Sequence, residues 1–139
     1  MMNRIRLLVV DDETRVRRGL AMRLEHEPDL VIVGEAADGS AALRLARELL
    51  PDVVVIDLLM SGMSGIQAIR ILRAAVPTIG ILAFSIRDDL TTRREASLAG
   101  ATTFVAKQEG PEPLLAAIRR IAARRHLHDF AGDEDTEVG

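Results

Sequence analysis

The sequence has no cysteine, tryptophan or tyrosine, and phenylalanine occurs only three times. A chain without cysteine cannot form disulfide bonds or thiolate metal sites, so a cytoplasmic protein is the simplest expectation. With so few aromatic side chains, the chain also lacks the platforms on which the bases of single-stranded nucleic acid stack. These absences exclude disulfide-stabilised secreted proteins and argue against single-strand binding.

Long hydrophobic runs and a strong net charge are missing as well. No apolar stretch approaches the roughly 18 residues that a membrane helix needs. The formal net charge of −3 gives no basic field for nucleic acid or an anionic membrane. We therefore expect no membrane partner and no direct nucleic-acid binding by this segment. With 48% hydrophobic residues, the 139-residue chain can build one ordinary domain.

Lysine is almost absent. Of the 18 lysine and arginine residues, only Lys107 is a lysine. An ammonium group is a compact point charge and a guanidinium group is a planar fork, so the two are not interchangeable. A single lysine in an arginine-rich chain therefore indicates a task that needs an amine.

Five short apolar runs alternate with stretches of helical periodicity. Strands are expected at residues 5–10, 30–34, 53–56, 79–84 and 103–106. Their continuous apolar character is typical of parallel strands that are buried on both faces. Strands that alternate with helices favour an α/β fold with helices on both sides of the sheet. We predict a flavodoxin-like (βα)5 three-layer sandwich whose five parallel strands take the order 2-1-3-4-5.

Details of the helices follow from their apolar spacing. The first helix is expected to be capped by Thr14 and to bury Val16 and Leu24 on one face, and the second to bury Leu50 at its end. From Arg124 onward the apolar pattern is lost, and the last residues are acidic and small. We therefore expect a domain over residues 1–125 and an acidic tail or truncated linker over residues 126–139.

Polar residues stand where the apolar strands end. The first strand is followed by Asp11 and Asp12, the third by Asp57 and the fifth by Lys107, while the fourth ends at Ser85. In open α/β sheets, ligands bind beyond the carboxyl ends of the strands, where the strand order reverses. These five side chains are therefore expected to converge on one site.

The chemistry of this set favours phosphoryl transfer to a carboxylate. Three carboxylates repel one another unless a cation neutralises them, and Mg²⁺ (or Mn²⁺) prefers such hard oxygen ligands. Lys107 can pair first with a carboxylate and then with a phosphoryl oxygen, and Ser85 offers a hydroxyl donor. Transfer to an aspartate needs mostly this positioning and charge neutralisation.

Four motifs carry a resemblance to a known family. They are Leu-Val-Val-Asp-Asp-Glu at 8–13, Val-Gly-Glu-Ala-Ala-Asp-Gly at 33–39, Asp-Leu-Leu-Met at 57–60, and Gly-Ala-x-x-Phe-x-x-Lys at 100–107. With them, the chain resembles the CheY-like receiver domains of response regulators over roughly residues 5–125. Within that family it is most similar to receivers of the NarL/FixJ type.

The resemblance implies a phosphorylation site and its metal ligands. Asp57 would be phosphorylated by a partner histidine kinase of a two-component system. Asp12, Asp57 and the backbone carbonyl of Leu59 would bind Mg²⁺ directly, and Asp11 would act through water. The chain would hydrolyse its own aspartyl phosphate and turn over no separate substrate, so it is not expected to be an enzyme.

The resemblance also implies a switch. Lys107 and Ser85 would bind the phosphoryl group, and Phe104 would turn inward when Ser85 moves. The surface of the fourth helix, fifth strand and fifth helix would then change its affinity for partners, with a phosphorylation-dependent homodimer as one possible outcome. Receivers of this type usually precede a DNA-binding domain, so control of transcription is expected if such a domain follows in the native protein.

Some positions depart from the family pattern and leave alternatives open. Ser61 stands in place of a frequent proline and is expected to loosen its loop, and Ile86 in place of alanine is expected to narrow access to Asp57. Gln108 replaces another frequent proline. One alternative is therefore a pseudo-receiver that is not phosphorylated and acts as a protein-interaction module. A phosphatase with an aspartyl nucleophile is a further alternative, but the acidic pair is adjacent and the chain has no room for a cap domain.

Overall fold

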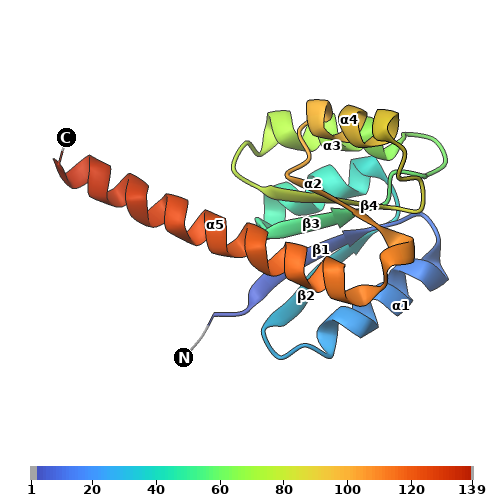
Figure 1. The fold of residues 1–139 in the computed structure, drawn as a ribbon, viewed down its shortest axis with the longest axis horizontal. Helices are drawn as coiled ribbons and strands as arrows, with labels where there is room; N and C mark the ends of the chain where they lie inside the picture. The colour runs from blue at the N-terminus through green and yellow to red at the C-terminus, as the bar shows by residue number, and fades with distance from the viewer. Residues whose placement is uncertain (1–2, 139) are drawn as a thin grey trace.

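The computed structural model describes the backbone of residues 3–138 and the side chains of residues 3–125. Within this range, strands and helices alternate along the chain (Figure 1). The strands are β1 (Ile5–Val10), β2 (Leu30–Ala36), β3 (Val53–Ile56), β4 (Gly80–Ser85) and β5 (Thr103–Ala106). The helices are α1 (Thr14–Glu25), α2 (Gly39–Leu49), α3 (Gly65–Ala75), α4 (Leu90–Ala99), the single 3-10 turn η1 (Lys107–Glu109) and α5 (Pro111–Val138).

All five strands form one parallel sheet in the order β2-β1-β3-β4-β5, which confirms the predicted topology. β1 pairs with both β2 and β3, and the central strand is β3, so the strand order reverses at β1. The crevice of such a fold opens at this reversal, beyond the carboxyl ends of β1 and β3. The register pairs Val10 with Ile56, so the next residue of each strand, Asp11 and Asp57, emerges at the same level.

Each face of the sheet has its own apolar core, as the continuous apolar strands predict. In β1, Leu8 and Val10 point to the core shared with α2, α3 and α4, while Leu7 and Val9 point to the core shared with α1 and α5. Figure 1 shows these two helical layers on opposite sides of the sheet. Burial of each such side chain contributes about 1.5–3 kcal/mol. The three-layer sandwich is therefore confirmed.

The helix next to the crevice begins at a well-formed cap. The Ser64 hydroxyl accepts a hydrogen bond from the Gln67 backbone N–H, and the Gln67 side chain accepts one from the Ser64 N–H. This capping box satisfies two backbone donors at the start of α3. It fixes the point at which the loop after β3 ends, only seven residues beyond Asp57.

Some expected details of the helices are wrong. Val16, in the first turn of α1, is 40% exposed, whereas Leu24 is buried as predicted. Leu50 is 61% exposed, since it lies past the end of α2 in a left-handed conformation (φ 47°) where helical spacing no longer applies. The N-cap of α1 is Glu13 rather than Thr14, and its side chain makes no capping hydrogen bond.

The last helix continues beyond the apolar pattern. The backbone of α5 stays helical to Val138, although the apolar spacing ends near Arg124, and Figure 1 shows it extending well past the sheet. The side chains of the expected tail, residues 126–139, lie outside the described part, so the division at residue 125 stays a prediction. None of the described helices combines the length and the apolar character that a membrane span requires.

Candidate functional site

Backbone pairing brings two carboxylates to the centre of the carboxyl edge. The Asp57 N–H donates to the Val10 carbonyl at 3.0 Å, and the Asp11 N–H donates to the Ala36 carbonyl at 3.1 Å. Sheet pairing thus continues one residue beyond β3 and β1. Because neighbouring strands lie roughly 4.8 Å apart, Asp11 and Asp57 are close neighbours at the reversal of strand order.

Lys107 joins these two carboxylates. Its Nζ lies 3.3 Å from Asp57 Oδ2 and 3.4 Å from Asp11 Oδ2, although the three residues come from three different strands. All three side chains are largely buried: 20% of Lys107, 12% of Asp57 and 4% of Asp11 is exposed. One ammonium therefore contacts two carboxylates and offsets one of their two negative charges, at a site where water screens them only partly.

A hollow of about 210 Å³ opens over this group. Its lining includes the acidic and basic side chains of Asp11, Glu13, Asp57 and Lys107 and the apolar residues Val16, Leu59 and Ile86. The exposed apolar side chains form its rim. A small group that reaches Asp57 would thus meet carboxylate oxygens and an ammonium inside the hollow and apolar side chains at its mouth.

A larger hollow, of about 580 Å³, lies at the opposite edge of the sheet and offers less chemistry. It is lined by Arg6, Asp52 and Arg125 among others. These residues already pair with one another, since Asp52 accepts hydrogen bonds from the Arg6 N–H and from Arg125 Nη1. The smaller hollow beside Asp57 is therefore the stronger candidate site.

The carboxyl group of Asp57 has a raised pKa. Burial is the main cause, and the neighbouring charge of Asp11 adds to it. The Leu59 N–H, which donates to Asp57 Oδ1 at 3.0 Å, and the Lys107 ammonium both oppose the rise. A partly desolvated carboxylate held by a lysine is typical of a reactive site rather than of a solvated turn.

Asp12 faces the loop between β3 and α3. Its Oδ2 accepts hydrogen bonds from the Ser61 N–H at 2.9 Å and from the Ser61 hydroxyl at 2.8 Å. These two bonds are the main cause of a lowered pKa at Asp12. Ser61 was expected to loosen the loop between β3 and α3, but it joins that loop to Asp12 by two hydrogen bonds. Asp12 is not among the residues that line the hollow.

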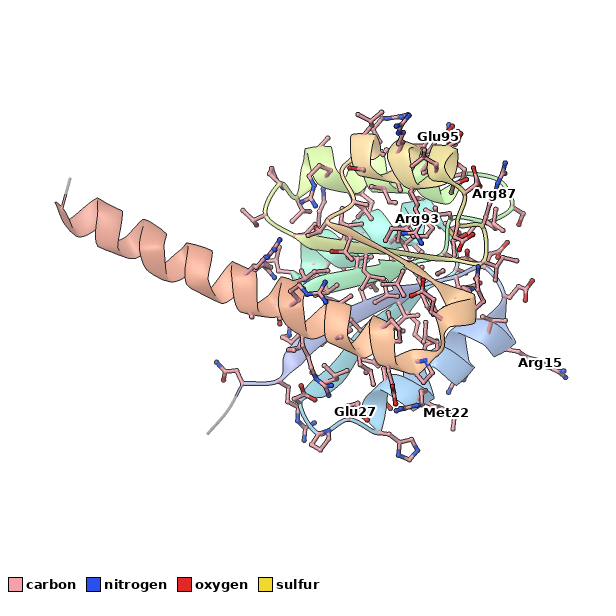
Figure 2. All side chains as sticks on the ribbon, in the orientation of Figure 1. Arg15, Met22, Glu27, Arg87, Arg93 and Glu95 are labelled. Carbon is pink, nitrogen blue, oxygen red and sulfur yellow. The ribbon has the colours of Figure 1, made fainter. Side chains whose placement is uncertain are left out.

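Ser85 and Phe104 lie near this edge but do not contact the two carboxylates. Ser85 is fully buried, and its hydroxyl accepts a hydrogen bond from the Arg87 N–H at 3.1 Å. Within the described part of the chain it makes no hydrogen bond with Asp57 or Lys107. Phe104 is partly buried against the α2–α4 core. The guanidinium carbon of Arg93, a residue that Figure 2 labels, lies 4.6 Å from the centre of the Phe104 ring.

Several contributions to the site were not predicted from the sequence. Arg17 donates to the Asp11 carbonyl at 2.8 Å and to Glu35 Oε1 at 3.1 Å, and so ties α1 to β1 and β2. The Gln108 amide donates to the Ile86 carbonyl at 3.3 Å and links the loops after β4 and β5. Such contacts join segments far apart in the chain, so no local pattern indicates them.

The oxygen atoms at this edge of the sheet are of the chemical type that hard divalent cations bind. The carboxylates of Asp11, Asp12 and Asp57 and the Leu59 carbonyl are the ligands that Mg²⁺ or Mn²⁺ prefers, and Lys107 already occupies the crevice with a positive charge. Among the side chains that the structure describes, no three acidic or histidine residues are arranged to hold a metal ion. The carboxylate of Asp12 is hydrogen-bonded to Ser61 instead.

Comparisons with known proteins agree with this geometry. Residues 7–119 match the family model of the response regulator receiver domain. The chain is 42% identical to the transcriptional regulatory protein LiaR of Bacillus subtilis over 83% of this chain and 54% of that protein. It is 38% identical to the nitrate/nitrite response regulator protein NarP of Escherichia coli over 81% of this chain and 53% of that protein. The chain thus spans about half the length of these curated relatives.

Solved structures show the same fold. A LuxR-family two-component response regulator from Aurantimonas is 38% identical with a TM-score of 0.84, and 88% of each chain is covered. The receiver domain of the putative response regulator NarL from Mycobacterium tuberculosis is 31% identical with a TM-score of 0.82, covering 88% of this chain and 98% of that one. The family match, the identities and the shared fold lead to one conclusion: this chain belongs to the receiver domains of two-component response regulators.

Proposed function

We propose that Asp57 accepts a phosphoryl group from a histidine kinase, with Mg²⁺ (or Mn²⁺) held by Asp12, Asp57 and the Leu59 carbonyl and with Asp11 acting through water. The observation that carries the proposal is the position of Lys107, whose ammonium lies within 3.4 Å of both Asp57 and Asp11. A largely buried lysine shared by two carboxylates can move to a phosphoryl oxygen without leaving the hollow.

The transfer is a displacement at phosphorus. A carboxylate oxygen of Asp57 forms the new P–O bond, the P–N bond to the donor histidine breaks, and its electron pair remains on the imidazole, which then takes a proton. Lys107 and the Ser85 hydroxyl bind the phosphoryl oxygens, and the metal, when bound, neutralises part of their charge. The same site later hydrolyses the aspartyl phosphate, with water as the nucleophile, and regenerates Asp57.

We propose that the signal then passes to the surface formed by α4, β5 and α5. Ser85 would exchange its hydrogen bond with the Arg87 N–H for one with the phosphoryl group. Phe104 would turn inward, away from the Arg93 guanidinium that now lies over its ring. A changed surface could then favour a phosphorylation-dependent homodimer. Where the native protein carries a DNA-binding domain, the output would be control of transcription, the role for which the transcriptional regulatory protein LiaR is named.

A mass measurement tests the acceptor role. The protein is incubated with Mg²⁺ and acetyl phosphate, and intact-mass spectrometry is expected to show the gain of one phosphoryl group. Asp57→Asn removes the nucleophilic carboxylate and should abolish the gain, while Asp52→Asn, at the opposite edge of the sheet, should keep it. A wild-type protein that gains no mass, or a gain that survives Asp57→Asn, would refute the proposal.

The alternative function is that of a pseudo-receiver that binds partners without being phosphorylated. The contact of Asp12 with Ser61 favours it, because a ligand for the metal is otherwise engaged. This alternative expects no Mg²⁺-dependent change in the NMR signals of Asp12 and Asp57. A saturable change in those signals would count against it.

A further inference from the structure

Ser61 is the residue of this site whose contacts the phosphoacceptor role does not explain. It lies 49 positions from Asp12 in the sequence, and both of its donors, the backbone N–H and the hydroxyl, reach the same Asp12 oxygen at 2.9 and 2.8 Å. A proline at this position would supply neither donor, because proline has no backbone N–H and no hydroxyl. The double contact is thus a property of serine at position 61.

The double contact occupies one of the two carboxylate oxygens of Asp12. A carboxylate oxygen has two lone pairs, so two hydrogen bonds use the bonding capacity of Asp12 Oδ2. Hydrogen bonds to an ionised acceptor are stronger than neutral ones. The other two carboxylates of the site, those of Asp11 and Asp57, are bound to Lys107 instead.

The position of Asp12 separates it from the rest of the site. Asp11, Asp57, Leu59 and Lys107 line the hollow, and Asp12 does not. Among these oxygen donors only Asp12 is held by the side chain of the loop between β3 and α3. The capping box at Ser64 anchors the far end of that loop to α3, which limits how far Ser61 can follow a moving carboxylate.

We propose that Ser61 is a positioning residue that holds Asp12 away from the metal site, so that a divalent cation binds only when Asp12 leaves Ser61. The metal affinity of this receiver is therefore lower than its carboxylates alone would give, and metal binding releases the loop after β3. The inference rests on the metal site of the proposed function and adds to it the residue that sets its affinity.

Variants at position 61 test the inference by the strength of Mg²⁺ binding, without any phosphorylation. Ser61→Ala removes the hydroxyl bond, Ser61→Pro removes both bonds, and Ser61→Thr retains both donors. Dissociation constants come from Mg²⁺ titrations of the ¹⁵N-labelled 139-residue chain followed by NMR. Loss of one net hydrogen bond of about 0.5–1.5 kcal/mol corresponds to a roughly two- to tenfold change in affinity.

The expected result is a roughly two- to tenfold tighter Mg²⁺ dissociation constant for Ser61→Ala. Ser61→Pro should bind at least as tightly as Ser61→Ala, and Ser61→Thr should bind like the wild type. In the wild type, Mg²⁺ should also shift the amide proton signal of Ser61 upfield, because the amide loses its bond to a carboxylate. Ser64→Ala is the matched control, since Ser64 caps α3 in the same loop without touching Asp12; its Mg²⁺ affinity should be that of the wild type.

Three outcomes would overturn the inference. An unchanged or weaker affinity in Ser61→Ala would mean that Ser61 does not compete with the metal. An equal gain in Ser64→Ala would assign the effect to the loop as a whole and not to the contact with Asp12. Absence of Mg²⁺ binding in the wild type and every variant would remove the metal site itself, so this last result alone would also contradict the metal requirement of the proposed function.

Discussion

At the scale of single residues, the site depends on one lysine that forms ion pairs with two carboxylates. Lys107 lies between Asp57 and Asp11, and it opposes the rise in the pKa of Asp57 that burial causes. The ammonium favours the ionised form of the Asp57 carboxylate at a place where desolvation favours the protonated form. The amine at position 107 is therefore as important for the state of Asp57 as for any later contact with a phosphoryl group.

Replacing Lys107 by alanine should raise the pKa of Asp57 further. The sign follows from the charges: a nearby cation stabilises the carboxylate, so its removal favours the protonated carboxyl group. A titration of the Asp57 carboxyl carbon by ¹³C NMR measures the shift. Arg87→Ala is the control, because Arg87 pairs with Asp89 on the adjoining loop and its removal should leave the titration of Asp57 unchanged. A pKa that stays the same or falls in Lys107→Ala would contradict the prediction.

Ile86 lines the hollow that leads to the same carboxylate. Its side chain is 63% exposed, it lines the hollow, and Gln108 holds its backbone carbonyl. Ile86→Ala removes a bulky group from the mouth of the hollow and should speed phosphorylation by acetyl phosphate or hydrolysis of the product. Time courses by intact-mass spectrometry check both rates, with Leu98→Ala on the exposed face of α4 as the control. Unchanged rates would show that Ile86 does not restrict access.

At the scale of secondary-structure elements, the start of α3 packs closely against the backbone of Asp57 and Leu58. The Gly65 N–H donates to the Leu58 carbonyl at 3.1 Å, and a Cβ atom at Gly65 would overlap the Asp57 carbonyl oxygen and the Leu58 backbone. Backbone atoms cannot move aside as a flexible side chain can. The absence of a side chain at position 65 thus permits the close packing that fixes the direction of the Asp57 loop.

Gly65→Ala should therefore destabilise the fold by about 1–3 kcal/mol, the usual cost of overpacking. Gly19→Ala is the matched control: it lies in an exposed part of α1 with no atom within 4 Å of the added Cβ, so it should stabilise the fold by roughly 0.5–1 kcal/mol. Urea denaturation followed by circular dichroism measures both free energies of unfolding. A neutral or stabilising effect of Gly65→Ala would show that the loop can move at little cost.

At the scale of the whole molecule, α5 is joined to the segment between α1 and β2 by a small charge network. Arg119 binds both Asp29 oxygens, with each N–O distance 2.9 Å, and also Glu27 Oε1 at 2.9 Å. Arg23 approaches Glu27 from α1. A bidentate arginine is the stronger kind of surface ion pair, and this one closes the layer of α1 and α5 across 90 positions of sequence.

Arg119→Gln should lower stability slightly at neutral pH and not at acidic pH. Hydrogen bonds with Arg119 lower the pKa values of Asp29 and Glu27 in the folded state. The stabilisation is therefore present above the unfolded-state pKa values of about 4 and is lost as the pH falls through the lower folded-state values. Thermal unfolding of wild type and variant across this pH range measures the difference. A difference that persists at the acidic end would assign the effect to packing.

The sequence by itself determined the order of elements and the identity of the residues at the strand ends. Continuous apolar strands alternating with helices can form few arrangements, so the five-stranded order was predictable, and with it the convergence of Asp11, Asp57 and Lys107. Helical periodicity mispredicted the burial of Val16 and Leu50, which lie in the first turn of a helix and just past the end of one. The apolar spacing of a sequence does not show which turns of a helix pack against the sheet.

Only the tertiary structure decided where the side chains of the site point. Lys107 could have faced either carboxylate or solvent, and Asp12 turned to Ser61 through a contact that spans 49 positions. Such choices depend on competition among donors and acceptors brought together by folding, which no local spacing encodes. The sequence pattern thus places Asp57 at the carboxyl edge of the sheet, whereas the folded structure determines which side chains contact Asp57 and which, like Asp12, contact other residues.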